Sequence, residues 1–220
     1  MNDAEARAAI CRIGRSLYER GYAHGTAGNI SMRLAGTQGY LITPTDACLG
    51  LLDPAALARV DGHGRPIGAA QPSKTLSLHR RIYASEPAAH CVLHTHSTHL
   101  VALTLAGVWT AAAVLPPITP YFLMKVGRVP LIAYKRPGDP AGADEVAQHM
   151  AAAHAAGEPL RAVLCERLGP VVWHHSPDAA MALLEELEET ARLWLMTTPR
   201  PAPLSAAQID ELRQTFGAGS

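Results

Sequence analysis

Residues 91–106 read CVLHTHSTHLVALTLA, and the fold can be worked out from this stretch toward both ends of the chain. The composition of CVLHTH predicts a strand over 91–96, and a helix is expected from Ser97 to Ala106. In a strand, side chains two residues apart project from the same face, so His94 and His96 are expected to point into one space. This suits two ligands of one divalent metal ion. The alternative is a pair of core histidines that hydrogen-bond to the backbone.

The surroundings of these histidines favour the metal interpretation. From Pro87 to Met124 the sequence contains no Lys, Arg, Asp or Glu. It also lacks the run of roughly 18 purely apolar residues that a membrane helix needs, so it is interpreted as buried protein interior. Buried imidazoles need polar partners, and a metal ion is a common one. His90 and His99 are further ligand candidates, with a structural role as the alternative for each.

Helices and strands are expected to intermix on both sides of this stretch, which predicts the α/β class in the broad sense. The patterns predict helices over 3–20, 73–85, 119–126, 140–156 and 177–196, with a last short helix after a capping box at Ser205 and Gln208. They predict strands after the glycine-rich turn at 25–29 and at 39–43, a hairpin over 58–67, and strands at 129–134, 161–166 and 170–175. Ser73 is the expected N-cap of its helix, and Gly169-Pro170 is expected to separate the last two strands.

The composition excludes several classes of protein. Nineteen basic residues balance nineteen acidic ones, which argues against a whole-surface electrostatic grip on nucleic acid or on an anionic membrane. The 220 residues are 48% hydrophobic, enough for a substantial core. No two of the four cysteines form a CxxC motif, and the first twenty residues are charged and unlike a signal peptide. We therefore expect reduced thiols in a cytoplasmic protein.

Two short segments are candidate anion sites. The turn GTAGN at 25–29 can present backbone N–H groups to an anion, although a simple tight turn is the alternative. Ser73-Lys74 stands at a predicted helix start, where free N–H groups and the helix dipole favour negative charge. The alternative is that Ser73 is an ordinary helix N-cap and that Lys74 is an exposed lysine without a ligand.

Two further candidate functional residues are single polar side chains in largely apolar segments. Tyr121 lies on the helix predicted over 119–126, where it is either a core residue or a functional hydroxyl. Glu166 is a single charge in an otherwise apolar strand, so it requires a partner if buried and is inert if exposed.

Taken in order, these segments resemble the class II aldolase/adducin family over roughly residues 5–197. The resemblance rests on GTAGNIS at 25–31, LITPTD at 41–46, PSK at 72–74, HTHSTH at 94–99, GPVVW at 169–173 and EELEETARL at 185–193. The run ITPYFLMKVGRVPLIAYKRPGDP at 118–140 resembles the branch of the family that decarboxylates 3-oxo-tetronate 4-phosphates.

The resemblance implies a fold and an assembly. It implies a three-layer α/β fold with a central, mostly antiparallel sheet flanked by helices, in one domain spanning 1–220 whose residues 197–220 form a linker and a short helix. It also implies a homotetramer with sites between subunits.

The resemblance further implies roles for particular residues. His94 and His96 would bind a divalent metal ion, zinc or else manganese. Tyr121 would reach a neighbouring subunit's site as a proton donor. The substrate phosphate would be bound by residues of three segments: Thr26, Gly28 and Asn29, then Thr45, then Ser73 and Lys74.

Three positions depart from the family's pattern. Thr75 stands where a glutamate commonly acts as acid/base beside the metal, Leu168 stands where a third histidine ligand is common, and Asp46 stands where glycine is common. An aldolase needs a base near the reacting carbons, whereas a β-keto acid decarboxylase mainly needs a Lewis acid for the charge left behind. On a regular strand Glu166 would share the face of Leu168, so we hypothesise that Glu166 replaces the third ligand.

The function expected from these features is metal-dependent decarboxylation of a 3-oxo-tetronate 4-phosphate to dihydroxyacetone phosphate and carbon dioxide, in the breakdown of four-carbon acid sugars. One alternative is a sugar-phosphate aldolase or epimerase of the same family. Another is a non-catalytic, oligomeric module like the adducin head. No partner other than the small-molecule substrate and further copies of the chain is expected.

Overall fold

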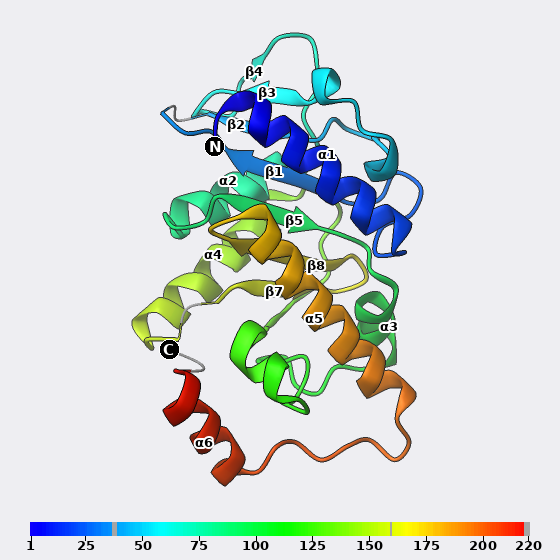
Figure 1. Ribbon diagram of the computed structural model, residues 1–220, viewed down its shortest axis with the longest axis vertical. Helices are drawn as coiled ribbons and strands as arrows, with labels where there is room; N and C mark the ends of the chain where they lie inside the picture. Colours follow the sequence, from blue (N-terminus) through cyan, green and yellow to red (C-terminus); the bar gives the residue numbers. More distant parts are fainter. Residues whose placement is uncertain (37–38, 159, 218–220) are drawn as a thin grey trace.

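Eight strands form one sheet in the order β4-β3-β2-β1-β5-β8-β7-β6 in the computed structural model, which describes residues 1–36, 39–158 and 160–217 (Figure 1). The strands are β1 Asn29–Arg33, β2 Tyr40–Ile42, β3 Ala58–Val60, β4 Pro66–Ile67, β5 Cys91–His94, β6 Leu131–Ile132, β7 Ala162–Cys165 and β8 Gly169–His174. Every neighbouring pair is antiparallel except β6 and β7, which are parallel. The expected mostly antiparallel sheet is therefore confirmed.

Helices cover both faces of the sheet and give the expected three layers (Figure 1). They are α1 Asp3–Glu19, α2 Leu76–Ser85, α3 Thr98–Ala106, α4 Pro140–Ala155, α5 Pro177–Met196 and α6 Ala206–Phe216, with shorter helical turns η1 Leu49–Leu51, η2 Pro54–Ala56 and η3 Phe122–Val126. The capping box predicted at the start of α6 is present.

The alternation of side chains along β5 divides the core between the two faces. Cys91 and Leu93 pack in one cluster with buried residues of α1, α3 and α5. Val92 packs in a second cluster with buried residues of α2 and α4. His94 has the parity of Val92, so this strand carries it to the α2 and α4 side of the sheet, at the strand's end.

Three expected boundaries are wrong, and each correction bears on the site. Strand β5 ends at His94, so His96 is not on the strand. Helix α2 begins at Leu76 with Thr75 as its N-cap, because Ser73 donates its N–H to the carbonyl of Thr43 in an extended segment. Gly169 and Pro170 belong to β8, and the turn before them occupies residues 166–168.

The remaining expectations about the chain concern thiols and membranes. All four cysteines are unpaired thiols, as expected. Within the described ranges, no helix combines the length and the apolar character that crossing a bilayer requires.

Candidate active site

A pocket of about 240 Å³ lies where β1 begins and β5 ends, beside the first turns of α2 and α4. It brings together eight residues that the sequence predicted for the site: Thr26, Gly28, Asn29, Thr45, Ser73, Lys74, His94 and His96. These residues come from four separate segments, so their meeting follows from the topology, which places β1 next to β5.

The rings of His94 and His96 lie at a spacing that suits two ligands of one metal ion. Their ring centres are 5.0 Å apart. Two imidazoles bound through nitrogens about 2.0–2.1 Å from one tetrahedral ion have ring centres about 5 Å apart, so the observed spacing fits. The shared strand face predicted in the sequence is not the cause, because His96 lies beyond the strand.

The tautomer of His94 is set by its backbone neighbour. Its Nδ1 lies 2.9 Å from the carbonyl oxygen of Pro170 in β8. A carbonyl can only accept, so Nδ1 carries the proton and Nε2 presents a free lone pair. A hydrogen bond of this kind is typical of histidines that bind metal ions.

Both imidazoles are held in the neutral form that can bind a metal ion. Burial, with a smaller contribution from nearby His96, lowers the pKa of His94 to about 4. Burial, and then the proximity of His24, also lowers the pKa of His96. A neutral imidazole is the form that donates a lone pair to a metal ion, so neither ring has to lose a proton to bind one at neutral pH.

The glycine-rich turn packs directly against the histidine segment. Gly28 has a φ of +90°, and a Cβ at this position would lie 2.8 Å from the carbonyl oxygen of His94. On the other side of the same segment, a Cβ on Gly169 would lie 2.3 Å from the carbonyl oxygen of Thr95. Only glycine fits at either position, so both are needed to hold the two histidines in place.

Asn29, which lines the pocket, has a buried polar atom without a hydrogen-bond partner among the described residues. It pairs directly with His94 across β1 and β5, and the pocket reaches both residues. The side-chain oxygen Oδ1 of Asn29 is buried and has no hydrogen-bond partner within the described residues. A buried polar atom without a partner is costly, so this amide is a natural contact for a polar ligand.

The anion-binding side of the pocket is assembled by backbone pairing. Pro44 and Pro72 form an isolated bridge, and the N–H of Thr45 donates to the carbonyl of Gln71 over 3.0 Å. This pairing holds Thr45 beside Ser73 at the entry to α2. The first turns of α2 and α4 both line the pocket, and helix N-termini favour negative charge.

Charged side chains stand around the pocket. Lys74 Nζ lies 3.8 Å from Asp46 Oδ1, and both side chains are mostly exposed, so this ion pair is weak and a ligand can displace it. Lys135 and Arg136 also line the pocket. The sequence reading missed these two residues, although they lie within the run that resembles the decarboxylase branch.

Asp46 is one of the three positions that depart from the family's pattern, and the other two lie in the pocket as well. Thr75 and Leu168 both line it. Thr75 Oγ1 is 3.1 Å from Ser73 Oγ, so it presents a neutral hydroxyl where the pattern has a carboxylate. Leu168 presents an apolar side chain that cannot bind a metal ion.

Four other candidates lie away from the two histidines. Glu166 is not among the lining residues, because the turn after β7 interrupts the strand and Glu166 Oε2 accepts a hydrogen bond from the N–H of Tyr134. The premise of a regular strand is therefore wrong. Tyr121 is 59% exposed at the start of η3, which leaves its hydroxyl free to act elsewhere. His90 is exposed, and His99 pairs with Glu188.

Glu188 has a structural role that sequence reasoning missed. Its buried carboxylate accepts hydrogen bonds from the N–H groups of His99 and Leu100 and contacts His99 Nδ1, at 2.9, 3.0 and 2.9 Å. It thereby caps α3 from α5 and fixes the segment that follows His96. In the sequence, Glu185, Glu186, Glu188 and Glu189 are most simply a solvated helix face, which conceals this role.

The residues present supply two protein ligands for a divalent metal ion. Among residues 1–36, 39–158 and 160–217, no group of three His, Cys, Asp or Glu side chains lies close enough together to hold one as arranged. The spacing of His94 and His96, the fixed tautomer of His94 and the neutral rings nevertheless fit a metal centre whose remaining positions are open.

Comparison with known proteins places this geometry in a family. The model of the class II aldolase and adducin N-terminal domain matches residues 8–195. A 3-oxo-tetronate 4-phosphate decarboxylase from Cupriavidus necator is 56% identical over 221 aligned positions, covering 98% of each chain.

Solved structures agree with this placement. The crystal structure of YgbL from Escherichia coli superimposes with a TM-score of 0.86 at 38% identity, covering 96% of this chain and 99% of that one. An L-fuculose 1-phosphate aldolase shares the fold, with a TM-score of 0.78 at 20% identity over 97% and 96% of the two chains. The chain therefore belongs to the class II aldolase and adducin family.

Proposed function

We propose that this protein decarboxylates a 3-oxo-tetronate 4-phosphate and releases dihydroxyacetone phosphate and carbon dioxide. The observation that carries the proposal is a single pocket that joins a neutral histidine pair to an anion-binding segment. The likeness to a relative that bears this activity in its name, over nearly the full length of both chains, supports the same reaction.

The phosphate end of the substrate is assigned to three segments. Backbone N–H groups of the turn at Thr26 and Gly28, the hydroxyls of Thr45 and Ser73, and the ammonium of Lys74 are suitable donors for phosphate oxygens. Substrate phosphate would displace Asp46 from Lys74. Lys135 and Arg136 would supply further positive charge for a ligand that carries both a phosphate and a carboxylate.

The reacting carbons are assigned to the histidine end. His94 and His96 would hold a divalent metal ion, zinc or else manganese, through neutral ring nitrogens. When bound, that ion supplies positive charge that stabilises the negative charge left on the substrate as carbon dioxide departs. Asn29, which the resemblance assigns to the phosphate, would also accept a hydrogen bond from a substrate hydroxyl at its unpaired Oδ1.

The neutral side chain of Thr75 suits decarboxylation more than aldol cleavage. Loss of carbon dioxide requires no base near the reacting carbons, and the hydroxyl of Thr75 does not repel the departing carboxylate. Tyr121 is assigned the return of a proton to carbon. Aldol cleavage must remove a hydroxyl proton, and Thr75 offers no carboxylate for this, so a sugar-phosphate aldolase or epimerase ranks second.

The assembly and setting are proposed with the reaction. A homotetramer would allow the exposed Tyr121 of one subunit to reach the pocket of its neighbour. Light scattering of the purified protein should then give four times the chain mass of 23.4 kDa. The cytoplasmic location stays a prediction.

Product analysis tests the proposed reaction. The protein supplied with Mn²⁺ or Zn²⁺ and a 3-oxo-tetronate 4-phosphate should form dihydroxyacetone phosphate, which a reductase and NADH detect. Condensation of dihydroxyacetone phosphate with an aldehyde, without decarboxylation, would instead establish the aldolase. No turnover of either kind with any divalent metal ion would favour the non-catalytic module.

A further inference from the structure

The metal centre described above lacks a third protein ligand. His94 and His96 supply two nitrogens, while Thr75 and Leu168 line the pocket without a histidine or carboxylate donor. Two imidazoles alone bind a divalent ion weakly, and catalytic zinc sites in proteins usually have three protein ligands. A further donor close to the pair would complete such a site.

His24 is the additional imidazole next to this pair. Its ring centre lies 6.5 Å from that of His96, in an edge-to-face arrangement with the planes at 75°. The residue lies between α1 and the glycine-rich turn, where its carbonyl accepts a hydrogen bond from the N–H of Ala27 over 2.9 Å. That bond fixes the backbone of His24 directly beside the pocket-lining residues Thr26 and Gly28.

The side chain of His24 is free to move. It is exposed, and within the described part of the chain its ring nitrogens form no hydrogen bond or ion pair with another residue. A rotation about its side-chain torsions therefore breaks no polar contact. Exposed side chains change rotamer readily, on the picosecond to nanosecond timescale.

We propose that His24 is the third protein ligand of a divalent metal ion held by His94 and His96, an inference that rests on the proposed function. The His94–His96 spacing of 5.0 Å already matches two ligands of one ion. The His24–His96 spacing of 6.5 Å is longer than the about 5 Å that a tetrahedral zinc requires, so His24 must close toward the pair as the metal binds.

The other possible donors in or near the pocket have contacts of their own. Asp46 pairs with Lys74, Asp139 accepts a hydrogen bond from the N–H of Ala141, and Cys165 packs against the second hydrophobic cluster. Glu166 accepts a hydrogen bond from the backbone of Tyr134, and its turn directs it away from the pocket lining. His99 Nδ1 is held by the buried carboxylate of Glu188. His24 therefore takes the place in the coordination sphere that Leu168 cannot fill.

Cobalt binding tests this assignment without depending on turnover. The full-length protein, its His24→Ala variant and a control His63→Ala variant are titrated with Co²⁺ against a competing chelator. His63 is also an exposed histidine, but it lies in the β3–β4 hairpin and does not line the pocket. Wild type and His63→Ala should show the intense visible bands of four-coordinate Co²⁺. His24→Ala should bind about 100-fold more weakly, because one of the ligands that share the binding free energy is gone.

Two results of the Co²⁺ titration would overturn the proposal. One is an affinity and a spectrum of His24→Ala that equal those of wild type, and the other is wild-type protein that binds no Co²⁺. A nitrogen-15 NMR titration with Zn²⁺ gives a second readout, since a ring nitrogen of His24 should shift together with those of His94 and His96. Unmoved His24 resonances would also overturn it.

The assignment of His24 as a ligand can fail independently of the proposed decarboxylation. If His24→Ala binds metal as wild type does while wild type releases carbon dioxide, the ligand assignment fails and the decarboxylase stands. If His24 proves to be a ligand while no carbon dioxide forms, the ligand assignment stands and the decarboxylase fails.

Discussion

The Nδ1 atom of His94 lies 2.9 Å from the carbonyl oxygen of Pro170, so the end of β5 is tied to the start of β8 through a side chain that lines the pocket. This bond leaves Nε2 as the nitrogen that can bind a ligand. The same two strands pair directly, with His94 opposite Val171. The pairing of β5 with β8 therefore also determines which ring nitrogen of His94 is available to a ligand.

Lys74 should contribute to phosphate binding more than to the chemical step. Its ammonium is held only by a weak exposed pair with Asp46, so it is available to the substrate. We expect Lys74→Ala to raise KM by about 10-fold with little change in kcat, because a charge-assisted hydrogen bond is lost in both ground and transition states. Steady-state kinetics measure this. With a substrate that lacks the phosphate, variant and wild type should have equal kcat/KM; an equal KM for the phosphorylated substrate would contradict the assignment.

Glu188 should position His96 from a distance. Its buried carboxylate caps α3, which begins directly after the histidine segment. We expect Glu188→Gln to weaken metal binding by about 10-fold to 100-fold, as is typical when a group that orients ligands is changed. Isothermal titration with Zn²⁺ measures the effect.

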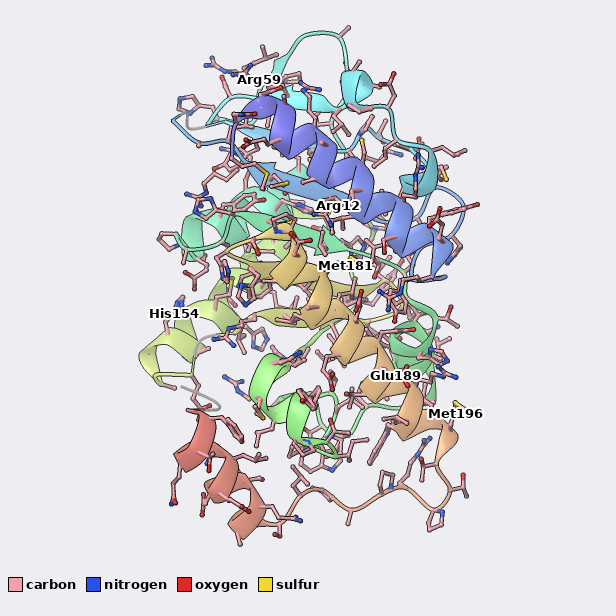
Figure 2. The ribbon with its side chains drawn as sticks, in the orientation of Figure 1. Arg12, Arg59, His154, Met181, Glu189 and Met196 are labelled. Atoms are coloured by element: carbon pink, nitrogen blue, oxygen red, sulfur yellow. The ribbon has the colours of Figure 1, made fainter. Side chains whose placement is uncertain are left out.

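Glu189 provides a matched control on the same helix. It projects from α5 at an exposed position (Figure 2), and its carboxylate pairs with Arg192. Glu189→Gln should keep wild-type metal affinity. If both variants behave alike, Glu188 has no positioning role.

His79 should make the protein sensitive to acid. It is fully buried on α2, its Nδ1 is 2.7 Å from Ser31 Oγ, and burial lowers its pKa from 6.5 to about 3. As the pH falls between these values, the unfolded chain takes up a proton that the folded protein does not. The free energy of unfolding should therefore fall by up to about 1.4 kcal/mol per pH unit, because burial keeps this imidazole neutral in the folded state.

Urea denaturation at a series of pH values measures this slope. In His79→Leu the free energy of unfolding should depend less steeply on pH over the same range, even if the variant is less stable throughout. The exposed His63→Ala variant should retain the wild-type slope. Equal slopes in wild type and His79→Leu would show that His79 is not the group responsible.

Much of the fold could be predicted because its signals are local. The helix predicted over 3–20 is α1, and the capping box at Ser205 starts α6, since both depend on neighbours within one or two turns. The glycine turn, the Thr45 segment, the Ser73 segment and the histidine pair were correctly expected to meet, because their order along the chain resembles a known family.

The remaining features depend on contacts between distant segments. The role of Glu188 requires α3 to lie beside α5, and the approach of His24 to His96 requires a turn to fold over a strand end. No period or spacing in the sequence encodes either contact. The same limitation explains the error about Glu166. Arg167 breaks the assumed strand with a left-handed φ of +61°, and its N–H donates to Thr104 Oγ1 of the distant helix α3.

Glu166→Ala should consequently leave metal binding unchanged. The carboxylate of Glu166 accepts a hydrogen bond from the N–H of Tyr134 and does not line the pocket. Metal content after dialysis, measured by plasma mass spectrometry, should equal that of wild type. A loss of metal in this variant would restore the interpretation drawn from the sequence.

The most direct test of the central claim is the metal dependence of carbon dioxide release. Protein stripped of metal by a chelator is mixed with a 3-oxo-tetronate 4-phosphate, and carbon dioxide is measured before and after Zn²⁺ or Mn²⁺ is restored. We predict release only with the ion, at one bound ion per chain, and none from a His94→Ala, His96→Ala double variant. Equal release from stripped, reloaded and double-variant protein would contradict the account.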